Sequence, residues 1–341
     1  FTDRLEIHET THFAKISSVG RLASLTLLIT IIIEALGAFA LWLQLGSLKS
    51  GNELLWSSIF HSVSAFNNAG FDIMKNYSSF TYFSANPAFL TTIALLVIAG
   101  GLGVLVLLDA LGRLFGGTLS TNSKIVLSIS AFLLAFGFLA ILAAEFSNAE
   151  TLGVLSLPNK LINAFFTSVI ARTAGFNSVS INDLHEQTRF LLMALMLIGG
   201  ATGSTAGGIK VNTFAVLALA TWAAIRGYDH TSAFGRRLSH RLVYRALAVT
   251  TLFMVAVFSA TVALTITEGF PFQQILFEVF SALGTVGLTT GITPDLSAPG
   301  KLTVIALMFF GRLGPLTLAY ALAQHARAPR YELPEGDISI G

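Results

Sequence analysis

The sequence predicts an all-α membrane protein built from three repeats, each with two membrane-spanning helices around a short re-entrant helix. Three observations support this fold class. Charged residues make up only 11% of the 341 residues and hydrophobic residues 54%, whereas a soluble domain carries about 25% charged residues. Long and short apolar stretches alternate along the chain, and each short stretch ends in a similar glycine-containing string. This number of charged residues is too small to cover a globular surface in water, and the helices are therefore expected in a bilayer.

Six apolar stretches are long enough to cross the hydrocarbon core, which takes about 20 residues as a helix. They cover residues 22–45, 87–111, 125–144, 190–225 (with an interruption), 246–266 and 302–323. Three shorter runs, 54–66, 161–171 and 272–283, are too short to span and fit re-entrant segments. The order long, short, long thus occurs three times. It predicts repeats at 17–120, 121–235 and 236–326 and a C-terminal tail at 327–341.

Each short run ends in a related string around one glycine. The first string is 66–71 (Phe-Asn-Asn-Ala-Gly-Phe), the second is 171–176 (Ala-Arg-Thr-Ala-Gly-Phe) and the third is 283–288 (Leu-Gly-Thr-Val-Gly-Leu). The third contains Thr-Val-Gly, the start of the Thr-Val-Gly-Tyr-Gly filter whose carbonyl oxygens replace the hydration shell of potassium. Simple helix-end caps are the alternative, but they do not explain why a short apolar run precedes each string.

Backbone can leave the helix at membrane depth only where protein buries it or where it lines a water-filled cavity. Three such strings around one axis predict a potassium-channel-like pore with re-entrant pore helices and a selectivity filter of peptide oxygens. The residues predicted to bind the ion are Asn68, Ala69, Gly70, Phe71, Thr173, Ala174, Gly175, Phe176, Thr285, Val286, Gly287 and Leu288.

A glycine-rich segment interrupts the fourth long stretch. Its five glycines will not hold a helix, because each costs about 1 kcal/mol relative to alanine. Three interpretations are open: a gate loop that obstructs the pore, the substrate site of an alternating-access, sodium-coupled secondary transporter, or a kink. The gate is the leading hypothesis. Its residues are Gly199, Gly200, Ala201, Thr202, Gly203, Ser204, Thr205, Ala206, Gly207, Gly208 and Lys210.

Some ionisable residues lie inside apolar stretches, among them Arg312, Glu34 and His61. Arg312 is about ten residues, or ~15 Å of helix, from either end of its stretch. It is too deep for easy snorkelling, so we expect it to face the pore as part of the gate, with a structural arginine on helix-end carbonyls as the alternative. Glu34 is similarly deep, and the sequence indicates no partner for it. His61 is expected on the surface of its short helix.

Other function classes are excluded by what the sequence lacks. There is no cysteine, which excludes disulfides, thiolate zinc sites and cysteine catalysis. His185-Glu186 is followed by Arg189 where a zinc protease has its second histidine, and no basic stripe indicates nucleic-acid binding. We therefore expect no enzyme, and no cofactor besides the transported ion.

Basic residues predict the orientation of the helices. Lys and Arg gather between the repeats and after the last one, and such short loops stay cytoplasmic. The three short runs therefore enter from the outside. The basic residues are Arg113, Lys124, Arg226, Arg236, Arg237, Arg241, Arg245, Arg327 and Arg330.

With these motifs the sequence resembles the Trk/Ktr superfamily of potassium uptake proteins. The resemblance rests on segments 60–71, 171–177, 200–210, 284–291 and 311–317, and the tail from Tyr331 to Gly341 is more similar to the Ktr membrane subunit than to the Trk one. It implies four membrane–pore–membrane repeats around one pseudo-fourfold pore, of which this sequence matches the second, third and fourth. The first repeat is expected to be missing, with Phe1 at an internal position.

The resemblance also implies where the protein works and with what. It implies potassium uptake across a bacterial plasma (inner) membrane by a multi-pass homodimer. A cytosolic nucleotide-binding regulatory ring is the implied partner. It further implies a gating role for the residues that match the intramembrane loop and the pore arginine.

Overall fold

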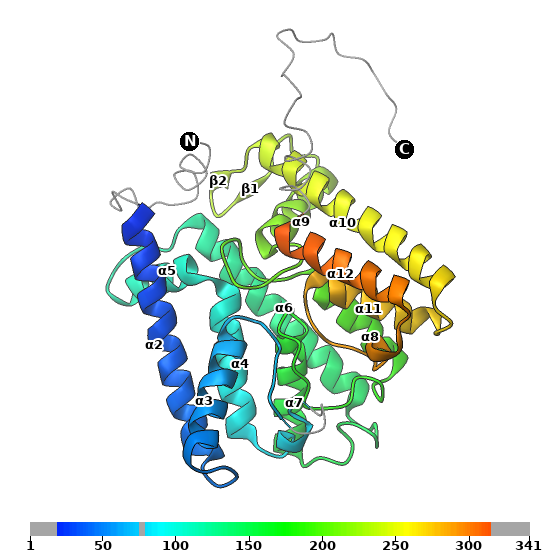
Figure 1. Ribbon diagram of the computed structural model, residues 1–341. Coiled ribbons are helices and arrows are strands. Elements are labelled where there is room, and N and C mark those ends of the chain that lie inside the picture. The colour runs from blue at the N-terminus through cyan, green and yellow to red at the C-terminus, as the bar shows by residue number, and fades with distance from the viewer. Residues whose placement is uncertain (1–18, 75–78, 315–341) are drawn as a thin grey trace.

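The computed structural model describes residues 19–74 and 79–314, and this part of the chain is almost entirely helical (Figure 1). Three predicted spans form long helices: α2 (Val19–Leu45), α6 (Thr121–Glu145) and α10 (His240–Thr267). Each is long and apolar enough to cross a membrane. Large apolar side chains on them face outward, such as Leu36 at 65% and Phe258 at 73% exposure, as expected where lipid replaces water. The prediction of a mostly helical protein with several candidate membrane spans is confirmed.

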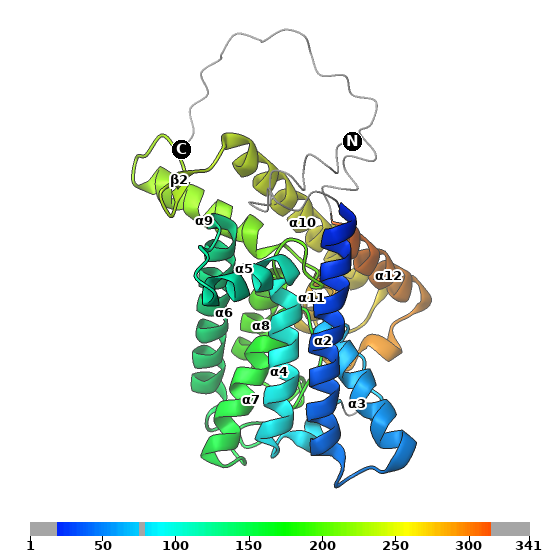
Figure 2. The same ribbon diagram turned by 90° about the vertical axis from the view of Figure 1, so that its left-hand side faces the viewer.

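The three short runs form short helices: α3 (Gly51–Phe66), α7 (Leu157–Ile170) and α11 (Phe272–Gly284). They contain 16, 14 and 13 residues, which is about 20–24 Å of helix against a hydrocarbon core of about 30 Å. Each packs against the long helix that precedes it. Figure 2 shows α3 and α7 beside the upright helices α2, α4 (Pro87–Leu102) and α6.

The helices that follow the short ones are broken. Helix α4 turns by 101° into α5 (Val104–Leu114) at Gly103, whose φ is +78°. The prediction of one continuous span over 87–111 is therefore wrong, because Gly103 adopts a backbone conformation that ends a right-handed helix. A non-helical loop separates α8 (Glu186–Leu197) from α9 (Val211–Ile225), as predicted.

The last described helix, α12 (Ala298–Leu313), ends at Gly314 with φ +83°, close to the value at Gly103. The rest of the predicted span 302–323 and the tail 327–341 lie outside the described residues, as does the start of the first repeat at residue 17. Six spans were predicted, the fourth of them with an interruption; the described residues contain three candidate spans, or four if α4 and α5 count as one.

Smaller elements connect the helices. A hairpin of β1 (Ser232–Ala233) and β2 (Arg236–Arg237) precedes α10, and 3₁₀ turns form at η2 (Thr81–Phe83) and η3 (Thr293–Asp295). Glu268, just after α10, accepts bonds from the hydroxyl and the amide of Ser297, which lower the pKa of its carboxyl below the usual 4.5. This contact joins the end of α10 to the start of α12.

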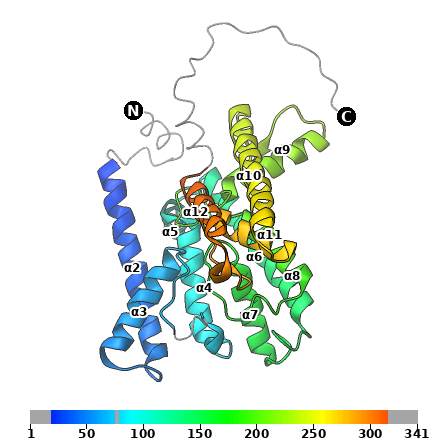
Figure 3. The same cartoon turned by 45° about the vertical axis from the view of Figure 1, so that its right-hand side comes forward.

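Helices of neighbouring predicted repeats also pack together. Helix α4 contacts α7, α8 contacts α11, and α9 contacts α10; Figure 3 shows α12 and α11 next to α10. Aromatic rings fill the junction of the first two predicted repeats, where Phe80 stacks on Phe176 with centroids 4.7 Å apart. These contacts join the three predicted repeats to one another.

Candidate functional site

The three strings share one backbone conformation. Two residues of each string have positive φ, which only glycine adopts without strain. The angles at the third positions are 50°, 70° and 51° for Asn68, Thr173 and Thr285, and at the glycines 73°, 76° and 94° for Gly70, Gly175 and Gly287. A left-handed non-glycine residue costs of order 1–3 kcal/mol and persists only where its surroundings impose it. Three segments far apart in the sequence are therefore built alike.

The strings lie side by side. A Cβ on Gly70 would be 2.6 Å from the carbonyl oxygen of Ala174, and one on Gly175 would collide with the carbonyl oxygen of Val286. The nearest atom to a Cβ on Gly287 would be the Cα of Gly175, at 3.5 Å. The second string is thus flanked by the first and the third, so the structure brings the three predicted strings together.

The fourth to sixth residues of the three strings differ from one another in burial. Ala174, Phe176, Val286 and Leu288 are buried, whereas Ala69, Phe71 and Gly287 are exposed. The Ser64 hydroxyl donates to the carbonyl of Phe71 at 2.6 Å, so this carbonyl faces α3. Phe71 is the predicted site residue whose oxygen the structure turns away from the other strings.

Polar atoms without partners gather at the third position of the strings. Within the described residues, no hydrogen bond is made by Asn68 Nδ2, Thr173 Oγ1 or Thr285 Oγ1, although all three atoms are shielded from solvent. Buried polar atoms are nearly always satisfied. The two threonine oxygens are therefore available to a ligand.

The interrupted helix forms a loop that is closed at its base. Gly199 N donates to Ile209 O at 2.9 Å, and Ile209 N donates to Leu197 O at 3.1 Å. A third bond, from Val211 N to Gly200 O, is 3.0 Å long. These backbone bonds hold the two ends of the loop together and leave residues 201–208 as its tip.

The tip of the loop reaches the inner ends of the first and third strings. Thr205 Oγ1 donates to Phe66 O at 3.2 Å, and a Cβ on Gly207 would collide with Thr285 Oγ1. On the side of α4, Ala201 N donates to Gly101 O at 2.9 Å. The loop therefore lies directly against the ends of α3 and α11.

Two cations hold the tip. Arg312 Nη1 donates to Thr205 O at 2.7 Å, and Lys210 Nζ donates to Ala206 O. Among the described residues neither has an acidic partner; the ion pair found there joins Lys49 and Glu53. Arg312 thus contacts the predicted gate through a carbonyl of the loop, a contact that the sequence could not specify.

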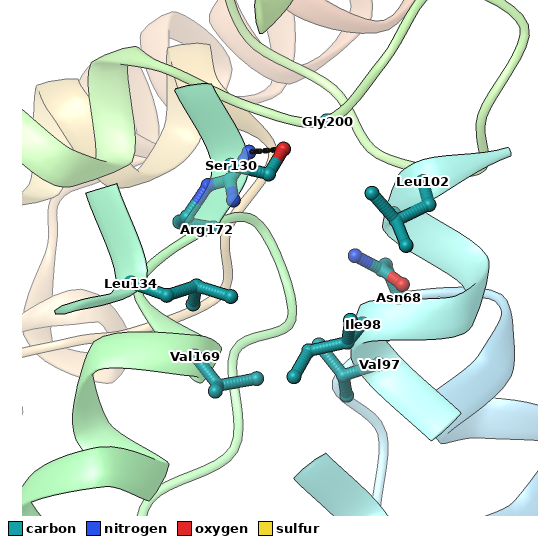
Figure 4. A pocket seen from close by; sticks show the side chains of 10 residues that line it. Asn68, Val97, Ile98, Leu102, Ser130, Leu134, Val169, Arg172 and Gly200 are labelled. Atoms are coloured by element: carbon teal, nitrogen blue, oxygen red, sulfur yellow. Dashed lines mark hydrogen bonds between the residues drawn. The ribbon is translucent and has the colours of Figure 1, made fainter. Parts of the chain in front are cut away.

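Arg172, which the sequence analysis did not assign to the site, supports the loop from the other side. It is 9% exposed, and its Nη2 donates to Gly199 O at 2.8 Å and to Ser130 Oγ at 3.4 Å. Figure 4 shows it across a small pocket from Asn68, and apolar side chains of α4, α6 and α7 line the rest of the pocket. A charged residue at the end of an apolar run was the available signal.

Two other expectations are resolved. Glu34 does have a partner: Asn67 Nδ2 donates to its carboxylate at 2.7 Å, and the Ser62 hydroxyl donates to its carbonyl at 2.7 Å. His61 is fully buried, so the expectation of a surface position is wrong. Its ring packs between Phe60 and Phe80, with centroids 5.6 and 5.4 Å away.

Known proteins with similar sequences are membrane transporters. The chain is 37% identical over 339 residues to Ktr system potassium uptake protein B of Bacillus subtilis, which covers 99% of this chain and 76% of the relative. It is 38% identical over 351 residues to the potassium/sodium uptake protein NtpJ of Enterococcus hirae, covering 100% and 76%.

A solved structure shows the same fold. The potassium transporter TrkH from Vibrio parahaemolyticus superimposes with a TM-score of 0.73 at 20% sequence identity, covering 93% of this chain and 68% of that one. The family model described as cation transport protein, TrkH, matches residues 8–331. These are ion transporters and not enzymes. The chain therefore belongs to the TrkH family of cation transport proteins, with the Ktr uptake proteins among its relatives.

Proposed function

We propose that this chain forms most of a potassium uptake pore, in which the three strings are parts of a selectivity filter and the loop 199–210 is a gate. The observation that carries this proposal is the common left-handed backbone of three adjacent strings, with unpartnered oxygens at Thr173 and Thr285. Two similar proteins, Ktr system potassium uptake protein B and the potassium/sodium uptake protein NtpJ, support potassium as the transported ion.

The filter would work by exchange of ligands. A potassium ion loses its water when enough protein oxygens at suitable distances take the place of the hydration shell. The peptide oxygens of the strings and the two threonine hydroxyls would supply those oxygens. Passage is possible when the ion binds strongly enough to enter but weakly enough to leave.

The gate would act at the inner end of the strings. The loop tip lies against Phe66 and Thr285, and Arg312 and Lys210 bind its carbonyls. Two positive charges next to the ion path raise the electrostatic energy of a cation there. Conduction would require the tip to move aside and these charges to move with it.

The secondary-transporter alternative is not favoured. It would need the broken helix to surround a substrate site of its own, whereas the tip residues bind the strings, α4 and Arg312. We further propose that the protein is a homodimer in a bacterial inner membrane and binds a cytosolic nucleotide-binding ring, as the family resemblance implies.

Uptake measurements test the filter. The complete transporter, including any segment before Phe1, is expressed in a potassium-auxotrophic strain, and uptake of ⁸⁶Rb⁺ and ²²Na⁺ is measured. We expect Thr285→Val, which keeps the shape of the side chain, to lower the Rb⁺/Na⁺ ratio about tenfold, since an ion ligand is worth at least a hydrogen bond to a charged group. An unchanged ratio in Thr285→Val and Gly287→Ala would contradict the filter assignment.

A further inference from the structure

Two ionisable side chains are buried on the short helices behind the strings. His61 on α3 is 0% exposed and Glu278 on α11 is 4% exposed. His61 lies five positions before Phe66, the first residue of the first string, and Glu278 lies five positions before Leu283, the first residue of the third. They therefore occupy the same place in two repeats.

The contacts of His61 fix its protonation state. Nδ1 is 2.7 Å from the carbonyl oxygen of Ser57, and the amide of Ile73 lies 3.3 Å from Nε2. A carbonyl can only accept a hydrogen bond and an amide N–H can only donate one. The ring must therefore be neutral, with its proton on Nδ1 and a lone pair on Nε2 for Ile73.

Glu278 binds the segment after the third string more extensively. Its Oε1 accepts from the Thr289 hydroxyl at 2.5 Å and from the Thr290 amide at 3.0 Å. Its Oε2 accepts from the Thr293 hydroxyl at 2.7 Å. The carboxylate joins the pore helix to three residues that follow the filter glycine.

The two contacts correspond residue by residue. Ile73 is the third residue after Gly70, and Thr290 is the third residue after Gly287. In both repeats, the same amide beyond the string donates to an acceptor at the same helix position. Because the chance of matching both helix position and amide position is low, the contact is a feature of the repeat.

The second repeat is held differently. Phe166 occupies the corresponding helix position, and its side chain offers no acceptor. There, Asn177 N donates to Ser79 Oγ at 3.1 Å and Phe80 N donates to Asn177 O at 2.9 Å. The second string is thus secured by the first repeat, while the two flanking strings depend on their own pore helices.

We propose that His61 and Glu278 are positioning residues that hold the outer ends of the first and third strings at the spacing required for ion selectivity. The strings contain strained left-handed residues, and such residues stay in place only when their surroundings fix them. Without the acceptor, the outer end of a string can relax and adjust to a smaller ion. This inference rests on the proposed filter function.

The test compares variants that remove the acceptor with variants that keep one. In the complete transporter, His61→Phe copies the residue of the second repeat, and Glu278→Met keeps the side-chain length. Each is expected to lower the ⁸⁶Rb⁺/²²Na⁺ uptake ratio about tenfold, the effect of losing one hydrogen bond to a charged or buried group. His61→Gln and Glu278→Gln retain an acceptor oxygen and should restore most of the ratio.

A matched control separates positioning from general stability. Glu145 is also a buried carboxylate, but its partners are Asn148, Thr151 and Thr188 and the amide of His185, outside the strings. Glu145→Gln should reduce the amount of folded transporter without changing the uptake ratio. If Glu278→Met does not fold, Thr289→Val removes one donor from the same carboxylate at an exposed position and should shift the ratio in the same direction.

The outcomes distinguish this inference from the proposed function. If Gly287→Ala changes the ratio while His61→Phe, Glu278→Met and Thr289→Val do not, the positioning role is wrong and the filter stands. If none of these variants changes the ratio, the filter assignment itself fails. A lowered ratio that the glutamine variants do not restore would also overturn the positioning role.

Discussion

At the scale of single residues, glycine is required in the strings for two separate reasons. One is a positive φ, which costs an L-residue about 1–2 kcal/mol. The other is space for the neighbouring string, since the carbonyls of Ala174 and Val286 lie where the Cβ atoms of Gly70 and Gly175 would be. Close packing of backbone on backbone is what brings peptide oxygens of different strings near one another.

These two requirements predict that alanine variants at different glycines have effects of different size. Gly175→Ala has both an unfavourable positive φ and a clash with the carbonyl oxygen of Val286. Gly287→Ala has the unfavourable φ, and the nearest atom to its Cβ is 3.5 Å away. Gly235→Ala, in the hairpin turn, has the unfavourable φ but no atom within 4 Å of its Cβ. We expect uptake to be abolished, reduced and nearly unchanged, in that order, and thermal stability in detergent to fall most for Gly175→Ala. Equal effects at Gly175 and Gly235 would mean that the strings do not pack as described.

The residues of the strings could be predicted because their pattern is local, whereas their supports could not. The third-position residues and the glycines recur at fixed steps after an apolar run, so the sequence alone indicates them. His61 and Glu34 acquire their roles from Ile73 and Asn67, which lie 12 and 33 positions away. Which side of a short helix is buried depends on such tertiary partners and not on the helix itself.

At the scale of elements, the breaks in the helices make room for the loop. A Cβ on Gly103, where α4 turns into α5, would lie 3.3 Å from Gly203 O and from Ser204. The bend of 101° therefore carries α5 away and lets the loop tip approach α4. The bend was not predicted because residues 93–108 contain no polar side chain, and an apolar composition alone does not indicate a change of helix direction.

Deleting residues 202–207 is predicted to raise flux. The deletion leaves the bonds between Gly199 and Ile209 and between Gly200 and Val211, so α8 and α9 stay joined. With the tip absent, the inner ends of the strings lose their cover. Uptake of ⁸⁶Rb⁺ per transporter should increase, and a decrease would instead favour a substrate site in the loop.

Arg312→Gln should act in the same direction but less strongly. It removes the bond to Thr205 O, and a hydrogen bond to a charged group is worth about 1.5–3 kcal/mol, so the closed state should lose about tenfold or more of its population. Arg113→Gln is the matched control, because Arg113 also donates to a carbonyl, that of Gly117, but does so at the end of α5. Equal flux changes in the two variants would show that Arg312 has no specific role in gating.

At the scale of the whole molecule, charge distribution and architecture agree on an orientation. Helices α5 and α9 and the β1–β2 hairpin lie at one end of the molecule, and the connections from α2 to α3 and from α6 to α7 lie at the other (Figures 1 and 2). The first end carries Arg113, Arg226, Arg236 and Arg237. Basic connections stay on the cytoplasmic side, so α3 and α7 should enter the membrane from outside.

Cysteine labelling can test this orientation with little background, since the chain contains no cysteine. Ser47→Cys and Glu150→Cys are at exposed positions in the α2–α3 and α6–α7 connections, and Tyr228→Cys and Arg237→Cys are exposed at the opposite end. A membrane-impermeant maleimide should label the first pair in intact cells and the second pair only in inverted vesicles. Labelling of Arg237→Cys from outside would mean that the orientation is the reverse of the one inferred. The loop and Arg312 would then lie at the external mouth, and the proposal of an internal gate would lose its basis.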